Sequence, residues 1–303
     1  MDFNTLKKQR ASQLEKLTDQ LKKANGGEQT SNNDDRFWYP ATDKAGNGFA
    51  VIRFLPAPAN EDVPFIRLFE HGFKAPTGKY YIEKSLTTIG KQDPVGEYNQ
   101  QLWNSTTDDS SPARKQVREQ KRKLNYISNI YIVKDPANPE NEGKVKLFKY
   151  GKKIFDKLNE AMNPQFADET PLNPFDLWDG ANFKIKIRQV EGYRNYDKSE
   201  FDSAEPLSED DKVLEKIWKS EHSLQEFLDP KNFKDYDTLK KKLHAVLGLE
   251  QRQHHEEEEA PQAPAPKLKA KHTTTPVEED SVPPWDGDEE DEELSYFKKL
   301  ASE

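Results

Sequence analysis

Cationic and aromatic side chains alternate along strand-like segments of this sequence. In a β-strand, successive side chains point to opposite faces. Segment 183–190 would bury its apolar side chains on one face and present a row of cations on the other: Lys184, Lys186 and Arg188. Segment 144–150 would place two cations and two rings on one face: Lys144, Lys146, Phe148 and Tyr150. Both segments predict a surface that carries positive charge.

Further cations and rings flank these segments. The additional cations are Lys121, Arg122, Lys123, Lys152 and Lys153, and the additional rings are Tyr126, Tyr193 and Tyr196. The bases of a single strand have free faces that stack on rings, while cations follow its phosphates. The alternative for each segment is that its rings are core residues and its lysines a solvated sheet face. The occurrence of three such segments favours a surface that binds single-stranded nucleic acid.

Charge separates the C-terminal residues from the rest of the chain. Residues 251–303 contain 15 acidic and 6 basic residues, a net charge of −9. This is also the net charge of the whole chain. Residues 114–153 contain 12 basic and 4 acidic residues, a local charge of +8. A basic surface and an acidic tail suggest a polyanion-binding protein that carries its own polyanion mimic. The tail is also rich in proline, so we expect it to be disordered.

Other motifs limit the classes of function. There is no cysteine, which excludes disulfides and thiolate metal sites. There is also no Gly-x-x-x-x-Gly-Lys-Ser/Thr phosphate-binding loop, which argues against a nucleotide-driven motor. No catalytic residue is predicted. No segment resembles a signal peptide or a membrane span, so we expect a soluble intracellular protein without membrane partners. An acidic-tailed scaffolding protein of the replication machinery and a nuclease are the alternative classes.

The expected elements are short strands followed by helices. Strands are predicted over 49–54, 65–69, 80–82, 126–133, 144–150 and 183–190, and helices over 3–24, 154–162, 207–228 and 236–249. Segment 85–112 reads as irregular. This order predicts an α+β fold with a β-barrel-like core and a helical appendage. The expected divisions are a basic arm (1–27), a core (28–250) and a disordered acidic tail (251–303).

Several motifs occur in the order found in one known family. They are His71–Lys74, Val133–Ala137, Pro139–Val145, Gly151–Ile154, Gly180–Phe183 and Asn195–Asp197. On these motifs, residues 1–250 resemble the single-stranded DNA-binding, helix-destabilising proteins of T-even-type bacteriophages. The resemblance implies an OB-fold core that coats single-stranded DNA in replication, recombination and repair, in the cytoplasm of an infected bacterium.

The resemblance also assigns roles to residues. It implies stacking or cleft-lining roles for Tyr126, Phe148, Tyr150, Tyr193, Tyr196 and Trp103. An N-terminal basic motif would dock on the next protomer and give cooperative binding, through Lys7, Lys8, Arg10 and Ser12. The acidic tail would contact replication and recombination proteins.

One departure from the family concerns zinc. The family binds zinc through one histidine and three cysteines, and His71 remains, but Ser85, Asp93 and Gly96 stand where thiolates are expected. A tetrahedral site of that type needs those ligands. We therefore predict no cofactor and a segment 71–97 held by packing.

Overall fold

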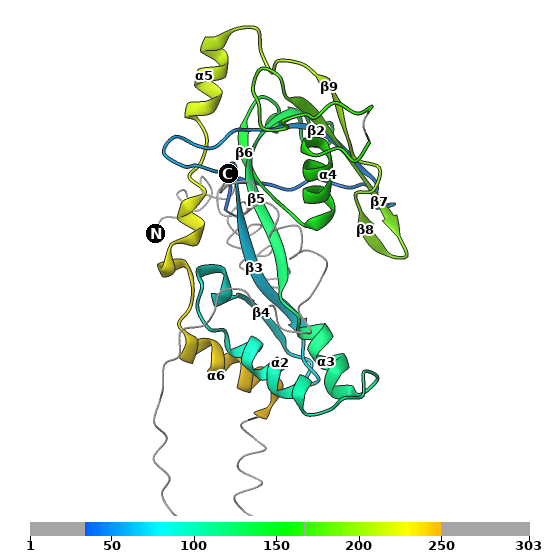
Figure 1. The fold of residues 1–303 in the computed structure, drawn as a ribbon, viewed down its shortest axis with the longest axis vertical. Helices are drawn as coiled ribbons and strands as arrows, with labels where there is room; N and C mark the ends of the chain where they lie inside the picture. Colours follow the sequence, from blue (N-terminus) through cyan, green and yellow to red (C-terminus); the bar gives the residue numbers. More distant parts are fainter. Residues whose placement is uncertain (1–33, 167, 250–303) are drawn as a thin grey trace, which may run out of the picture. The chain divides into compact units, whose positions relative to one another are not determined.

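The computed structural model describes residues 34–166 and 168–249 (Figure 1). The predicted helix 3–24, the basic motif with Lys7, Lys8, Arg10 and Ser12, and the acidic tail lie outside these residues. Two units are separated between Phe37 and Trp38, and the second unit carries the fold.

Strands and helices follow one another along the described residues. The strands are β1 (Phe37–Trp38), β2 (Gly48–Phe54), β3 (Phe65–Lys74), β4 (Tyr80–Lys84), β5 (Lys123–Lys134), β6 (Val145–Tyr150), β7 (Ala181–Val190), β8 (Tyr193–Asn195) and β9 (Glu200–Ala204). The α-helices are α2 (Pro94–Asn104), α3 (Pro112–Gln120), α4 (Lys152–Met162), α5 (Asp211–Lys219) and α6 (Tyr236–Leu247). Short 3-10 turns are η1 (Leu86–Ile89), η2 (Pro139–Asn141), η3 (Gln225–Leu228) and η4 (Pro230–Asn232). Every predicted strand is present, and so are the helices predicted at 154–162 and 236–249. The helix predicted at 207–228 is shorter, because only α5 and η3 form there.

Strand β5 organises the sheet. Along one edge it pairs with β6, and along the other it pairs first with β3 and then with β2. From residue 38 onward the order is β6-β5-β2-β7-β8, with β4 added to β3 and β9 added to β7. These pairs are antiparallel, which allows short connections and one face packed on a core. The α+β class is confirmed, whereas the pairings in the described residues do not close the sheet into the expected barrel.

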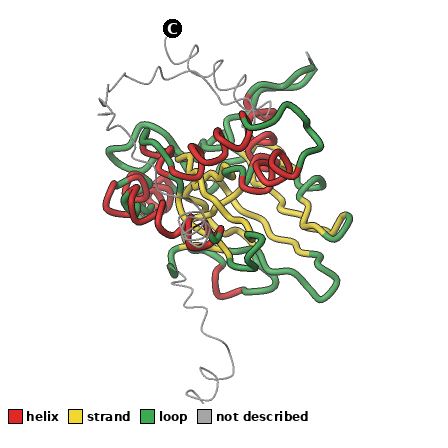
Figure 2. The backbone as a smooth tube through the Cα atoms, turned by 90° about the horizontal axis from the view of Figure 1, so that it is seen from below, coloured by secondary structure: helices red, strands yellow, loops and turns green. Residues whose placement is uncertain are grey.

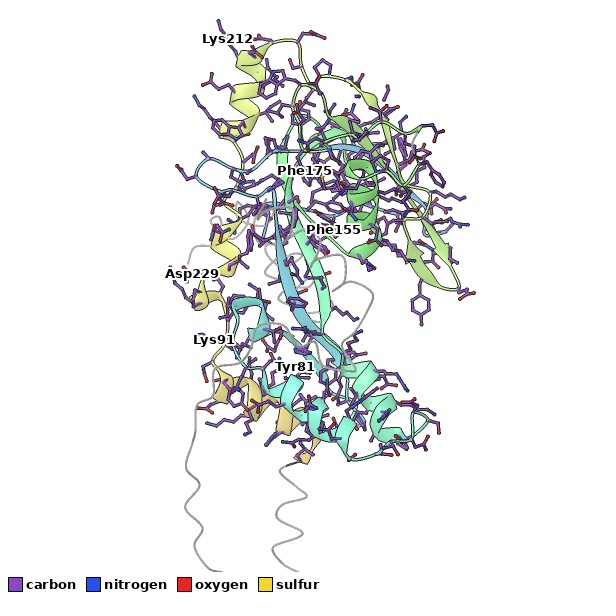
Figure 3. The ribbon with its side chains drawn as sticks, viewed as in Figure 1. Tyr81, Lys91, Phe155, Phe175, Lys212 and Asp229 are labelled. Carbon is purple, nitrogen blue, oxygen red and sulfur yellow. The ribbon has the colours of Figure 1, made fainter. Side chains whose placement is uncertain are left out.

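Aromatic residues fill the core between the sheet and α4. The ring of Phe155, on α4, stacks on Tyr126 with centroids 3.9 Å apart and planes 3° from parallel. The ring centroids of Phe155 and Phe175 lie 5.3 and 6.3 Å from the ring centroid of Phe65, and Figure 3 shows both residues in this region. Offset and edge-on ring pairs stabilise a core beyond the area that they bury. The apolar face of α4 therefore covers the face of β5 that carries Tyr126.

The opposite face of β5 and β6 is also covered. Leu214 and Ile217 of α5 pack with Leu55 and Leu177, and Tyr131 and Val145 contact this cluster. Strands buried on both faces lose the polar–apolar alternation of a half-solvated sheet. This second layer explains why every side chain of β6 is buried or partly buried.

Helices α2, α3 and α6 pack around the ends of β3, β4 and β5. Phe73 and Tyr81 stack at 5.2 Å, and Val95, Leu243 and Val246 pack with them. Figure 1 shows β3 and β5 running from the α4 side of the sheet to these helices, and Figure 2 shows helical segments around the strands. The strands β3 and β5 therefore connect the core below α4 to this helical layer.

Candidate nucleic-acid interface

The predicted cationic row on β7 is present. Phe183, Ile185 and Ile187 are buried, and the alternate side chains lie on the outer face. Each cation of the row contacts a carboxylate: Lys184–Asp202 at 2.7 Å, Lys186–Glu200 at 2.6 Å and Arg188–Asp197 at 2.5 Å. The row is therefore compensated by acidic residues of β9 and of the turn that precedes it.

These carboxylates are ionised at neutral pH. The hydrogen bond from Arg188 lowers the pKa of Asp197 to about 2, and hydrogen bonds from Lys186 and Lys184 lower the pKa values of Glu200 and Asp202. A phosphate that binds this row would compete with carboxylates already in place. These partners were not predicted from the sequence, although Glu200 and Asp202 alternate along a segment that follows the row closely in the chain.

Three predicted stacking rings are not exposed. Tyr126, Phe148 and Tyr150 are 2%, 2% and 3% exposed, so the expectation that they present free ring faces is wrong. Lys146, Phe148 and Tyr150 do share a face of β6, but that face packs on the core. Phe148 meets Trp38 edge-on at 5.4 Å, and the hydroxyls of Tyr150 and Ser128 are 2.9 Å apart.

The hairpin of β7 and β8 carries the most exposed ring of the predicted set. Tyr193 is 79% exposed, whereas Tyr196 is partly buried and packs against the core. Glu191 and Gly192 have φ angles of 53° and 82°. Positive φ at both central residues is typical of the type I′ turn, whose twist matches a β-hairpin. The turn therefore holds Tyr193 at the start of β8, away from the core.

The remaining predicted cations have varied surroundings. Lys152 contacts Asp156 at 3.2 Å, and Lys153 donates to Asn195 at 3.3 Å. The exposed members of the set are Lys123, Lys144 and Lys153, and the partly buried members are Lys121, Arg122, Lys146 and Lys152. The structure brings Lys153 to the β8 hairpin, but it does not gather the cations into one row.

A cluster of rings and arginines lies near the start of β5. The guanidinium of Arg122 is 4.2 Å from the ring centroid of Phe69, and that of Arg67 is 5.3 Å from the same ring. On the neighbouring helices, the guanidinium of Arg114 lies 4.1 Å from the ring of Trp103. Sequence reasoning missed Arg67, Phe69 and Arg114. Arginine and phenylalanine at 67 and 69 share a strand face, and that spacing was the available signal.

A hydrogen-bonded network occupies the place of the expected zinc ligands. His71 Nε2 is 3.0 Å from Asp93 Oδ1, and Ser85 Oγ donates to Asp93 Oδ2 at 2.9 Å. Backbone N–H groups also donate to Asp93, from Leu86 at 3.0 Å, Val95 at 3.0 Å and Gly96 at 3.3 Å.

These residues do not fit a zinc ion. The set lacks thiolates, Gly96 has no side chain, and the imidazole and carboxylate already contact each other. Burial raises the pKa of Asp93, but the hydrogen bond and charge of His71 and the bonds from Leu86 and Ser85 outweigh it, and the pKa falls to about 2. Among the described residues, no group of three or more His, Cys, Asp or Glu could hold a metal ion.

An antiparallel sheet with exposed lysines and an exposed tyrosine on a hairpin is an arrangement that suits single-stranded nucleic acid. The family model described as "gp32 DNA binding protein like" matches residues 46–247, and the chain belongs to this family.

Named relatives agree with this match. The chain is 41% identical over 240 residues to the "Single-stranded DNA-binding protein" of Enterobacteria phage T4, covering 77% of each chain. It is 41% identical over 226 residues to the protein of the same name from Enterobacteria phage T2, covering 72% of each. A shorter match, 49% over 70 residues, covers 22% of this chain and 61% of the protein of that name from Escherichia phage SV14. Within the part of the chain that the structure describes, the helices are all too short or too polar to cross a bilayer.

Proposed function

We propose that this chain is a non-enzymatic protein that binds single-stranded DNA and coats it during phage DNA replication, recombination and repair in the infected bacterium. The observation that carries the proposal is the family match across residues 46–247, together with two relatives of that name at 41% identity. The relatives favour this function over the scaffolding and nuclease alternatives.

The described surface supports sequence-independent binding. Tyr193 offers an exposed ring, and Lys123, Lys144 and Lys153 offer exposed charges. Stacking tolerates every base, because each base has a π-face. Part of the proposal is that the sheet around β5 derives from an OB fold, a class of partly open barrel that binds oligonucleotides across its strands. We also infer that the segment from His71 to Gly96 is organised by Asp93 rather than by zinc.

Two further parts of the proposal concern residues outside the described ranges. The basic arm, 1–27, would dock on a neighbouring protomer and give cooperative coating. The acidic tail, 251–303, would compete with DNA for the basic surface and recruit replication and recombination proteins, because a tethered segment has a high local concentration.

Fluorescence titration with oligo-dT tests the function. A stacking protein changes its tryptophan and tyrosine emission on binding, and its affinity falls steeply with salt. A scaffolding protein would not bind the oligonucleotide, and a nuclease would shorten it when magnesium is added. Absence of binding at low salt would refute the proposal.

Truncation tests the two termini. Removal of residues 251–303 is expected to tighten binding to oligo-dT and to abolish capture of replication proteins. Removal of residues 1–24 is expected to leave affinity for a short oligonucleotide nearly unchanged and to lower cooperativity on long strands. Equal losses on short and long strands would place the arm in the binding surface instead.

A further inference from the structure

A pocket of about 400 Å³ lies between two segments that are distant in the sequence. One wall comes from η1 and the residues that follow it, through Leu86, Ile89 and Lys91. The other wall comes from the end of η4 and the start of α6, through Phe233 and Tyr236. Cavities of about 300–1,000 Å³ are typical of binding sites. This cavity, the η1–α6 pocket, therefore has room for one large aromatic side chain.

The cations of the η1–α6 pocket favour an acidic ligand. Lys91 is exposed, and no carboxylate of the described residues contacts it. Lys234 is also exposed and contacts Glu83 at 2.6 Å, but Glu83 is shared with Lys242. Two cations on one carboxylate leave a net positive charge beside the pocket, in addition to that of Lys91.

The rings and the carboxylate of the pocket are already held by their neighbours. The ammonium of Lys84 lies 5.4 Å from the centroid of the Phe233 ring, and the hydroxyl of Tyr236 donates to Glu97 at 2.6 Å. The lining carboxylate, Asp235, accepts from the backbone N–H of the third residue of α6 at 2.9 Å and therefore caps that helix. The walls are thus preorganised, and an occupant would not have to displace these contacts.

Residues 283–293 of the same chain have a matching composition. Trp285 follows two prolines, and seven of the eight residues 286–293 are acidic. Proline fixes φ, so such a segment loses less conformational entropy when it docks. The other aromatic residues of the tail, 296–297, are followed by two lysines, which the cations of the pocket would repel. Charge therefore favours Trp285 as the occupant.

The length of chain between α6 and Trp285 permits this contact. The pocket lies at the first turn of α6, and the 12 residues of this helix span about 18 Å. Between Leu247 and Trp285 the sequence advances by 38 residues. A flexible chain of that length has an average end-to-end distance of roughly 30 Å or more. Tethering also gives the segment a high local concentration, so that weak contacts are sufficient for docking.

We propose that the η1–α6 pocket is the docking site of residues 283–293, with the indole of Trp285 in the pocket and the acidic residues beside Lys91 and Lys234. Figure 3 shows Lys91 on the other side of β3 from Phe155, which lies on α4. Figure 1 shows the hairpin of β7 and β8 on the α4 side. The docking site is therefore separate from the exposed ring of that hairpin. This inference does not rest on the proposed function, because the contact forms within one chain and needs no DNA.

The test follows Trp285 in the full chain by fluorine NMR after incorporation of fluorotryptophan. Trp285→Phe removes one resonance and so assigns it. We expect this resonance to differ from that of a free peptide of residues 280–295, and Lys91→Glu should move it to the peptide position. Lys212→Glu is the matched control, because Lys212 is an exposed lysine of α5 that Figure 3 shows far from Lys91.

Three results would overturn the inference. The first is a wild-type Trp285 resonance at the position of the free peptide, and the second is an equal response to Lys91→Glu and Lys212→Glu. The third is a resonance that saturating oligo-dT moves but Lys91→Glu does not, which would place the segment on the DNA-binding surface. Unchanged resonances of Trp38 and Trp218 would show that Lys91→Glu leaves the fold intact. Failure to bind oligo-dT would refute the proposed function and leave the comparison of the lysine variants valid.

Discussion

Asp93 is the acceptor at which β3, η1 and α2 meet, and its removal gives a sharp prediction. The residue is 4% exposed and accepts hydrogen bonds on both carboxylate oxygens. Its donors come from β3 through His71, from the start of η1 through Ser85 and Leu86, and from the first turn of α2. Asp93→Ala would leave these buried donors without an acceptor.

The expected cost follows from this geometry. Each buried polar group left without a partner costs about 1–3 kcal/mol. Several buried donors would lose their acceptor at once and these costs overlap, so we expect Asp93→Ala to lower the free energy of unfolding by about 3–5 kcal/mol. Asp210 is a matched control, because it also caps a helix but is exposed and accepts one backbone bond, from Lys212 at 2.9 Å. Asp210→Ala should cost about 0.5–2 kcal/mol.

Urea unfolding of the full chain, with and without chelator, is the assay. The urea midpoint of the wild-type protein should not change with chelator or with added zinc, because hydrogen bonds to Asp93, and not a metal ion, connect β3, η1 and α2. A loss for Asp93→Ala no larger than for Asp210→Ala would refute the reasoning, and so would a midpoint that falls on chelation.

The pH dependence gives a second measurement on Asp93. Its pKa is about 2 in the folded chain against an ordinary 3.8. A carboxylate with a lowered pKa stabilises the folded state above its unfolded pKa, and this contribution is lost as pH falls through the folded value. Wild-type protein should therefore lose stability between about pH 4 and pH 2, and Asp93→Asn should lack that part of the decline.

Three further outcomes are expected. Tyr193→Ala should weaken oligo-dT binding by about 1–3 kcal/mol without changing stability. Tyr126→Ala should instead lower the free energy of unfolding by about 3–5 kcal/mol. A stability loss for Tyr193→Ala in unfolding experiments, with only a binding loss for Tyr126→Ala in titrations, would contradict the burial argument. Glu200→Gln frees Lys186 and should steepen the salt slope of binding by up to about 0.7; an unchanged slope would mean that Lys186 does not face the strand. Burial raises the pKa of Glu221 to about 8, and both its carboxylate oxygens lack a hydrogen-bond partner. A carboxyl with a raised pKa destabilises the fold as pH rises from its unfolded value, so wild-type stability should decline between about pH 4.5 and 8, and Glu221→Gln should abolish that decline in urea unfolding.

The strands were predictable because their apolar pattern is local. The segments around β2, β5 and β7 alternate or run apolar at strand length, and the structure forms strands there. Helix α2 falls in segment 85–112, which was expected to be irregular because it contains Pro94 and Gly96, and no helix was predicted at α3, which begins at Pro112. Both prolines instead occupy the first helical turn, after the capping residues Asp93 and Ser111. Proline is favoured at that position, where its missing N–H has no partner to lose.

The site was harder to predict than the strands. Alternation correctly placed Phe148 and Tyr150 on one face of a strand, but it does not say which face meets the core. That choice is made by α4 and by Trp38, which are distant in the sequence or on another element. The carboxylates opposite the β7 row and the partners of Phe69 are also set by tertiary pairing. Local spacing therefore identified charged and aromatic surfaces without identifying their partners.

The carboxylates on β9 give the β7 cations counterions that cannot diffuse away. When cations of a protein neutralise the phosphates of DNA, counterions condensed on the DNA are released and gain entropy, and high salt reverses that gain. Asp197, Glu200 and Asp202 remain attached to the chain when a phosphate replaces them, and each freed carboxylate attracts a cation in turn, so the net release of ions at this row is small. The β7 cations would exchange a carboxylate partner for a phosphate partner with little net change in the number of free ions. The contribution of this row to DNA affinity would thus depend less on salt concentration than that of uncompensated cations.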